Sequence, residues 1–351
     1  MKRLVRRCFD EGGYSYAMRI EEAARRFGSD RVARLSSNEN PLPPSDAAVE
    51  EGCNSLAGVN RYPDEGVGRF IRALREHYGD YHFVAGVGMD GVIETTIRTL
   101  VEPGDRVAVS TPTFSFYGLA AVAQGAEVVS VPRDGTFAVD PGRFARAACG
   151  AKLSFLCTPN NPTGNATPIE AVREILESTD GMLFLDNAYV EYSDLDYTKL
   201  MDRYDRLIIG RTMSKIFSLA GLRIGYAFVP EWFVPYYRRA ATPHTVNSVS
   251  AAAAHGAFCD RGRLTGIRTR VAEWRERVIR ECRYPTFPSD SNFIMVDVAP
   301  RTGDEAVERL ADKGVLVRSC KGFSGLADHY IRVSYGEEWE NDRFLEAINS
   351  I

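Results

Sequence analysis

Short apolar runs alternate with helix-like stretches between residues 80 and 230, and this alternation constrains the fold more than any other feature of the chain. The runs are rich in Val, Ile and Leu with little polar alternation, as expected for strands whose two faces are both covered. Strands are predicted at Arg106–Ser110, Glu127–Val131, Leu153–Cys157, Met182–Asp186, Leu207–Gly210 and Ile224–Val229, with helices at Gly91–Val101, Phe116–Ala123 and Pro168–Ser178. This pattern predicts an α/β domain with a mainly parallel sheet, whose ligands bind beyond the carboxyl ends of the strands.

The C-terminal part of the chain follows a different pattern. Its predicted elements are an arginine-rich helix through Thr269–Glu281, strands at Asn292–Val298, Val315–Arg318 and Tyr330–Ser334, and helices near Gly303–Lys313 and Glu340–Ile348. We therefore expect a large domain over 51–245 and a small α+β domain over 246–351. The segment 1–50 is too short for a core of its own and is expected to pack on the small domain or on a partner subunit.

Composition and charge exclude several classes of function. The net charge is −4, with acids and bases interleaved, so no basic run predicts nucleic-acid binding. No window approaches the roughly 20 apolar residues that span a bilayer, and the first residues contain no apolar stretch of signal-peptide length, so a cytoplasmic protein is expected. The seven cysteines are dispersed without a C-x-x-C pair, which predicts reduced thiols and no metal site.

Lys215 stands out because the chain has only six lysines among its 43 basic residues. It lies between Ser214 and a run of small apolar residues, where its amine could be partly buried and nucleophilic. Arg223, eight residues further on, could anchor an anion beside it. Taken alone, the stretch is explained more simply as an ordinary turn with one solvated lysine.

Other polar or aromatic residues follow the predicted strands. Glycines at 86–91 lead into a helix whose N-terminus could bind a phosphate. Phe114 could stack on a planar ring or simply pack in the core. The turn Asn160-Asn161-Pro162 could hold an amide as a fixed donor. Asp186 ends an apolar strand, either as a helix N-cap or as a buried carboxylate that needs a cationic partner, with Tyr189 nearby.

Together these features meet the needs of one cofactor. Pyridoxal phosphate requires an imine-forming lysine, a phosphate site, a stacking ring, a carboxylate at the pyridine nitrogen and donors to its phenolate oxygen. We therefore predict that the chain binds pyridoxal 5'-phosphate.

With these residues in view, the chain resembles the fold-type-I pyridoxal-phosphate aminotransferases of class I/II, and among them the histidinol-phosphate aminotransferases most. The similar motifs are Ser37-Asn38-Glu39-Asn40-Pro41, Arg61-Tyr62-Pro63-Asp64, Asn160–Gly164, Ser214-Lys215 and Tyr330–Ser334. The resemblance implies a large domain with a mainly parallel seven-stranded sheet between helices, plus a small α+β domain.

The resemblance also implies roles for single residues. Lys215 would form the internal aldimine and then move the proton between Cα and C4′. Asp186 would pair with the pyridine nitrogen, and Phe114 would stack on the ring. The remaining cofactor contacts implied are Asn161 and Tyr189 at O3′, Thr212, Ser214, Arg223, Met89 and Asp90 at the phosphate, and Tyr62 at the phosphate of a neighbouring subunit. The last contact implies a homodimer with shared active sites.

On the substrate side, Arg332 matches the arginine that binds a carboxylate. Arg318, Tyr14, Tyr16 and Asn40 are further candidates for substrate contacts. The chain departs from the family at Met89, where a small residue is common, and at residue 187, where Asn replaces Glu.

The reaction that the resemblance implies is transamination between L-histidinol phosphate and 2-oxoglutarate, giving imidazole-acetol phosphate and L-glutamate in histidine biosynthesis. Alternatives are threonine-phosphate decarboxylation in cobalamin biosynthesis and a broad aromatic or aliphatic amino-acid aminotransferase. A non-catalytic pyridoxal-phosphate-binding regulator is the remote alternative, because the N-terminal segment leaves no room for a DNA-binding module.

Overall fold

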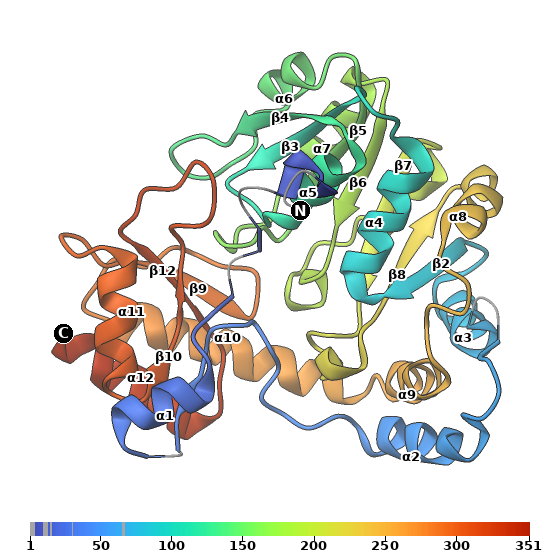
Figure 1. Ribbon diagram of the computed structural model, residues 1–351. Coiled ribbons are helices and arrows are strands. Elements are labelled where there is room, and N and C mark those ends of the chain that lie inside the picture. The colour runs from blue at the N-terminus through green and yellow to red at the C-terminus, as the bar shows by residue number, and fades with distance from the viewer. Residues whose placement is uncertain (1–3, 10–12, 15, 30, 65–66) are drawn as a thin grey trace.

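The computed structural model describes residues 4–9, 13, 14, 16–29, 31–64 and 67–351. A seven-stranded sheet forms the larger part of the molecule, and two small sheets form the smaller part (Figure 1). In spatial order the large sheet contains β2 (His82–Val87), β8 (Ile224–Val229), β7 (Leu207–Thr212), β6 (Met182–Asp186), β5 (Ala151–Cys157), β3 (Arg106–Thr111) and β4 (Glu127–Pro132). The pairs from β7 to β4 are parallel, and β8 is antiparallel to both of its neighbours.

Helices cover both faces of this sheet, which is why its strands are apolar on both sides. One face packs against α4 (Gly88–Leu100), α5 (Phe116–Gln124) and α8 (Val234–Ala240). The other packs against α3 (Gly68–Tyr78), α6 (Pro141–Ala147), α7 (Ile169–Ser178), α9 (Ser248–Cys259) and α10 (Arg263–Glu281). Along β6, Phe184 joins the first core and its neighbours Leu183 and Leu185 join the second, as alternation along a strand requires.

The smaller part of the molecule contains a three-stranded antiparallel sheet in the order β11 (Arg318–Ser319), β12 (Tyr330–Ser334) and β9 (Phe293–Asp297). A two-stranded parallel sheet joins β1 (Ala33–Arg34) to β10 (Val315–Leu316), so residues from both ends of the chain meet. The helices of this part are α1 (Ile20–Phe27), α11 (Gly303–Ala311) and α12 (Glu338–Ser350).

Helices α2 (Asp46–Ser55) and α10 lie beside α9 or continue from it. Helix α2 packs against α9. Helix α10 then runs from the neighbourhood of α9 to the small sheet (Figure 1). Short 3-10 turns lie at Arg7–Phe9, Leu56–Gly58, Val190–Tyr192, Thr198–Asp202, Ala220–Leu222 and Glu231–Phe233.

The predicted fold class is confirmed, and the differences lie at element ends. Each predicted strand of the large sheet is present, and those at Met182–Asp186 and Ile224–Val229 have the predicted bounds. Strand β2 has no counterpart among the strands predicted. The helix predicted at Gly91–Val101 begins earlier, at Gly88, because this glycine has a φ of +67° and turns the chain directly from β2 into α4.

The domain boundaries at 50/51 and 245/246 stay a prediction. Among the described residues, no helix is both long enough and apolar enough to cross a membrane.

Candidate active site

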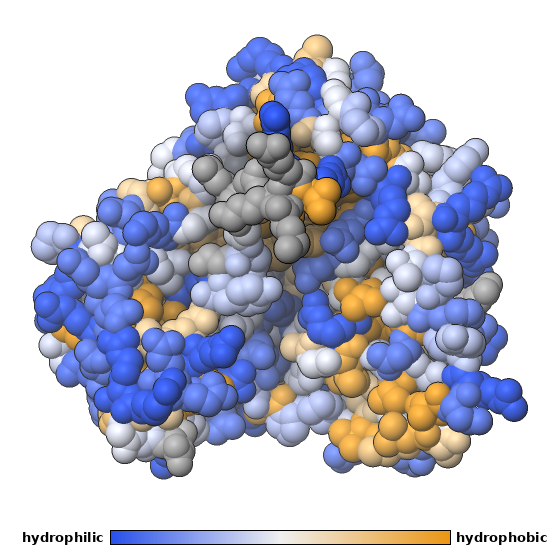
Figure 2. Space-filling view, in the orientation of Figure 1, coloured by the Kyte–Doolittle hydropathy of each residue, from blue (hydrophilic) through white to orange (hydrophobic). Residues whose placement is uncertain are grey.

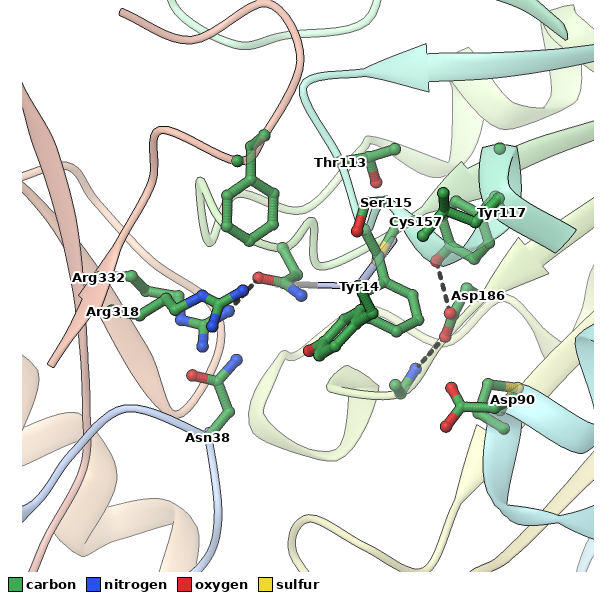
Figure 3. Close-up of a pocket in the computed structure, with 18 of the residues that line it drawn as sticks. Tyr14, Asn38, Asp90, Thr113, Ser115, Tyr117, Cys157, Asp186, Arg318 and Arg332 are labelled. Atoms are coloured by element: carbon green, nitrogen blue, oxygen red, sulfur yellow. Dashed lines mark hydrogen bonds between the residues drawn. The ribbon is translucent and has the colours of Figure 1, made fainter. Parts of the chain in front are cut away.

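A cavity of about 600 Å³ opens at the carboxyl ends of the central strands. Figure 3 shows Asp186 and Tyr117 on its large-sheet side, Arg318 and Arg332 on its small-sheet side, and Tyr14 between them. The residues predicted from the sequence that line it are Tyr14, Tyr16, Met89, Asp90, Phe114, Asn161, Asp186, Tyr189, Thr212, Ser214, Lys215, Arg223, Arg318 and Arg332. The strand register explains part of this convergence, since Cys157 at the end of β5 lies opposite Asp186 at the end of β6.

Asp186 is buried with no cation paired to it among the described residues. The Tyr117 hydroxyl donates to its Oδ2 at 2.5 Å, and the Ala188 N–H donates to its Oδ1 at 2.9 Å. Loss of solvent raises the pKa of this carboxyl to about 6, against the two hydrogen bonds, which lower it. A carboxylate in this state favours a cationic partner such as a protonated ring nitrogen.

Lys215 lies in the turn after β7, and its amine reaches the pocket. Its Nζ donates to the Ser37 carbonyl oxygen at 3.3 Å. Burial lowers the pKa of this amine to about 8, and the nearby charge of Arg332 acts in the same direction. A larger neutral fraction makes the amine a better nucleophile and base near neutral pH.

Tyr189 and Asn161 both line the cavity and contact residues of the small sheet, Phe293 and Arg332 respectively. The Tyr189 hydroxyl accepts a hydrogen bond from Asn38 Nδ2 at 3.0 Å. Burial raises the pKa of this phenol, so it stays protonated. Asn161 Oδ1 accepts a hydrogen bond from Arg332, which leaves the amide nitrogen of Asn161 available as a donor.

The residues predicted to bind a phosphate at the start of α4 are held in place by hydrogen bonds. The carbonyl oxygen of Arg223 accepts the Gly88 N–H at 2.9 Å, and Arg223 Nη2 donates to Asp90 Oδ2 at 2.9 Å. Thr212 Oγ1 accepts the Ser214 N–H at 3.1 Å. The guanidinium therefore lies beside the free N–H groups of a helix N-terminus, an arrangement that binds phosphate.

Arg332 and Arg318 come from paired positions of β12 and β11. The Arg332 guanidinium is buried and donates to the Ser36 carbonyl oxygen at 2.7 Å, while its Nε has no partner among the described residues. Burial lowers the pKa of this guanidinium. The guanidinium of Arg318 lies 5.7 Å from the centre of the Tyr14 ring, and the Tyr14 ring is edge-on to Phe114. Two arginines thus face one end of the cavity.

Two predicted site residues do not line the cavity. The Asn40 amide is used within the chain, donating to the Ile216 carbonyl oxygen at 3.0 Å and accepting the Leu42 N–H. Tyr62 is 83% exposed and stacks on His244 with ring centres 4.7 Å apart. Its predicted contact with a neighbouring subunit stays a prediction.

Tyr117 and Asn38, whose side chains hydrogen-bond to Asp186 and Tyr189, are site residues that were not predicted. Tyr117 lies in α5, with its ring centre 5.6 Å from that of Phe114, but Phe114 precedes the helix, so helical spacing does not predict this contact. Asn38 lies inside the Ser37–Pro41 motif, but nothing in the motif indicates that its side chain contacts Tyr189.

The residues present fit pyridoxal phosphate. Asp186 lacks a cation, Lys215 has a depressed pKa, and the start of α4 with Arg223 forms an anion site. Among the described residues, no cluster of His, Cys, Asp and Glu side chains could hold a metal ion.

Comparisons with known proteins agree with this geometry. Residues 30–348 match the family model of the class I and II aminotransferases. A histidinol-phosphate aminotransferase of Methanoculleus marisnigri is 62% identical over 352 aligned positions, covering 100% of both chains. One of Methanosphaerula palustris is 55% identical, covering 97% of this chain and 96% of that relative. The crystal structure of histidinol-phosphate aminotransferase from Sinorhizobium meliloti, in complex with pyridoxal-5'-phosphate, is 25% identical with a TM-score of 0.87, covering 98% of this chain and 97% of that one.

Proposed function

The chain belongs to the class I and II aminotransferases, and we propose that it transfers the amino group of L-histidinol phosphate to 2-oxoglutarate. The products are imidazole-acetol phosphate and L-glutamate, a step of histidine biosynthesis. The observation that carries this proposal is the 62% identity, along the whole chain, to a histidinol-phosphate aminotransferase. The pocket supports it with an amine, a buried carboxylate and two arginines.

Pyridoxal phosphate supplies the electron sink on which amino-group transfer depends. Asp186 would face the ring nitrogen, because a buried carboxylate stabilises a cationic N–H and is stabilised by it. Phe114 would stack on the ring. The other groups that would hold the cofactor are the side chains of Asn161 and Tyr189 at O3′, and Thr212, Ser214, Arg223 and the N–H groups of Met89 and Asp90 at the phosphate.

Lys215 has two tasks in this proposal. Its Nζ would hold the cofactor covalently. The free amine would also take a proton from the substrate Cα and deliver it to C4′. The pKa of about 8 supports both tasks, because each needs the neutral amine at some stage.

Arg332 serves both half-reactions. Histidinol phosphate has no carboxylate, so Arg332 would face its phosphate in one half-reaction and the carboxylate of glutamate in the other. A guanidinium can bind either group through two parallel hydrogen bonds. Arg318 and Tyr14 lie at the same end of the cavity and would contribute to the phosphate site.

The active form in this proposal is a homodimer. Tyr62 does not line the cavity of its own chain and is largely exposed. It would reach the cofactor phosphate of the partner subunit, so that each site uses residues of both chains.

A steady-state assay tests the substrate. With histidinol phosphate and 2-oxoglutarate at saturating concentration, we expect glutamate to form in the amount of histidinol phosphate consumed. Threonine phosphate should release no carbon dioxide in a parallel assay. Absence of glutamate with histidinol phosphate would refute the proposed substrate, and carbon dioxide release from threonine phosphate would replace it with the decarboxylase.

A further inference from the structure

Residues 35–40, which we call the strap, cross between the small sheet and the pocket. The Leu35 carbonyl oxygen accepts the Ser334 N–H at 2.9 Å, which fixes the strap to β12. Further along, the carbonyl oxygens of Ser36 and Ser37 accept hydrogen bonds from Arg332 and Lys215. The strap is therefore in contact with site residues from both parts of the molecule.

Asn38 is the buried centre of the strap, and Ser334 orients its side chain. The Asn38 N–H donates to Ser334 Oγ at 2.8 Å, and that hydroxyl lies 3.0 Å from Asn38 Oδ1. The Ser334 hydroxyl donates its single proton to Asn38 Oδ1 while one of its lone pairs accepts the N–H. The amide oxygen therefore faces Ser334, and the amide nitrogen faces Tyr189.

The backbone holds this arrangement in place. Asn38 has a φ of +53°, a conformation that asparagine tolerates better than most residues. Its carbonyl oxygen accepts a hydrogen bond from Asn292 Nδ2 at 3.1 Å. Asn38 itself is 1% exposed, so water does not compete for its amide.

The direction of the next hydrogen bond follows. Asn38 Nδ2 has only protons to offer, so the Tyr189 hydroxyl must accept at 3.0 Å. The phenol stays protonated because burial raises its pKa, and none of its hydrogen bonds to described residues uses its own proton. That proton is therefore available to the pocket, which Tyr189 lines.

We propose that Asn38 is a positioning residue that makes the Tyr189 hydroxyl a hydrogen-bond donor to the O3′ atom of the cofactor. The inference rests on the proposed cofactor site and assigns to the strap a task in setting the proton affinity of the bound cofactor. A donor at O3′ stabilises the phenolate, so it lowers the pH at which the visible absorption band of the bound cofactor changes with protonation.

Replacing Asn38 with Asp tests the direction of this bond, because the two side chains have the same shape. The carboxylate offers acceptors only, so the Tyr189 hydroxyl would turn toward it and away from O3′. With pyridoxal phosphate as the only ligand, we expect the midpoint of the spectral titration to rise by about one pH unit. Tyr189→Phe should raise the midpoint similarly, and the double variant should show no further rise, because both changes remove one hydrogen bond.

Asn292→Ala separates this task from a structural one. It removes the hydrogen bond to the Asn38 backbone but leaves the amide facing Tyr189, so it should lower the melting temperature without moving the midpoint. If Asn38→Asp does not fold, Ser334→Ala is tested instead. It removes the hydrogen bond that orients the Asn38 amide. The midpoint should then rise by a smaller amount.

A wild-type midpoint in Asn38→Asp, or in Ser334→Ala where that variant is used, overturns the inference while the proposed cofactor stands. Failure of the wild-type protein to bind pyridoxal phosphate overturns the proposed function instead, and the inference with it.

Discussion

At the scale of single residues, burial opposes the charge of two groups that the proposed chemistry needs. Burial raises the pKa of the Asp186 carboxyl to about 6 and lowers the pKa of the Lys215 amine to about 8. At Asp186, hydrogen bonds from Tyr117 and Ala188 partly compensate for the loss of solvent. A cofactor with a cationic ring nitrogen would compensate further, so cofactor binding and folding are linked.

Asp186→Asn should stabilise the cofactor-free protein at neutral pH. The folded-state pKa of Asp186 is raised from 3.8 to about 6, so its contribution to stability falls as pH rises through that window. Asparagine does not ionise, but its amide nitrogen cannot accept the hydrogen bond that one carboxylate oxygen accepts, so the variant should be more stable at pH 7 by about 1 to 2 kcal/mol. Urea unfolding at pH 7 and pH 5 measures this, and the difference should shrink at pH 5. A variant less stable than the wild type at pH 7 would contradict the prediction.

Lys215→Ala should abolish covalent attachment of pyridoxal phosphate. Borohydride reduction followed by mass spectrometry should find the adduct on Lys215 in the wild type and no adduct in the variant. Loss of proton transfer alone should slow turnover by about 10²–10⁴-fold. Lys199→Ala is the control, since Lys199 is exposed and does not line the cavity. An adduct retained in the Lys215 variant would place the reactive lysine elsewhere.

At the scale of elements, the strands of the large sheet were predictable because both of their faces are covered. Runs such as Met182–Asp186 are continuously apolar, and that pattern needs no knowledge of the rest of the fold. Element ends were less predictable. The start of α4 depends on the left-handed conformation of Gly88, and the sequence pattern of a glycine-rich turn does not fix it.

The site was predictable where a residue carries a distinctive chemical group after a strand, as Asp186 and Lys215 do. Tyr117 was missed because it is fully buried and stacks on Phe155, so its sequence pattern is that of a core residue. Asn38 was missed because its partners Ser334 and Tyr189 are distant in sequence, and only the folded chain brings them together.

Gly88→Ala tests the junction of β2 and α4. A Cβ at this position would lie 2.6 Å from Arg223 Nη2, and the φ of +67° is strained for alanine. The guanidinium would have to move, so the affinity for pyridoxal phosphate should fall by about tenfold or more. Equilibrium binding should show a smaller loss for pyridoxal, which lacks the phosphate.

Gly91→Ala is the matched control for that variant. It lies in the same turn of α4, and its added Cβ would meet the Val87 Cβ at 3.4 Å, an ordinary contact. We expect nearly unchanged affinity. Equal losses for pyridoxal and its phosphate in Gly88→Ala would show that the phosphate does not bind at this junction.

At the scale of the whole molecule, one face bears apolar side chains that the chain itself leaves uncovered. Figure 2 shows hydrophobic residues gathered at the lower right, where Figure 1 places α2. Val49 in α2, with Leu56 and Val59 just after it, are each about half exposed, and Tyr62 follows at 83%. Exposed apolar groups of this kind mark interaction surfaces, which supports the proposed dimer.

Mixing subunits tests whether Tyr62 serves the partner's site. Tyr62→Phe should weaken the cofactor's phosphate contact, and Lys215→Ala should be inactive. In a heterodimer of the two, the site with an intact Lys215 would receive Tyr62 from the other chain. Activity at limiting pyridoxal phosphate should therefore reappear when the two variants are unfolded together and refolded.

The matched mixture pairs Lys215→Ala with Gly88→Ala. Gly88 lies beside Arg223 of its own chain. The only site with Lys215 in this heterodimer would therefore keep the damaged phosphate site at the start of α4. Activity should not reappear there. Recovery in both mixtures would mean that the measured activity does not depend on which chain supplies the phosphate site. Recovery in neither would show that Tyr62 acts on the site of its own chain. Only recovery confined to the Tyr62 mixture agrees with sites built from two subunits.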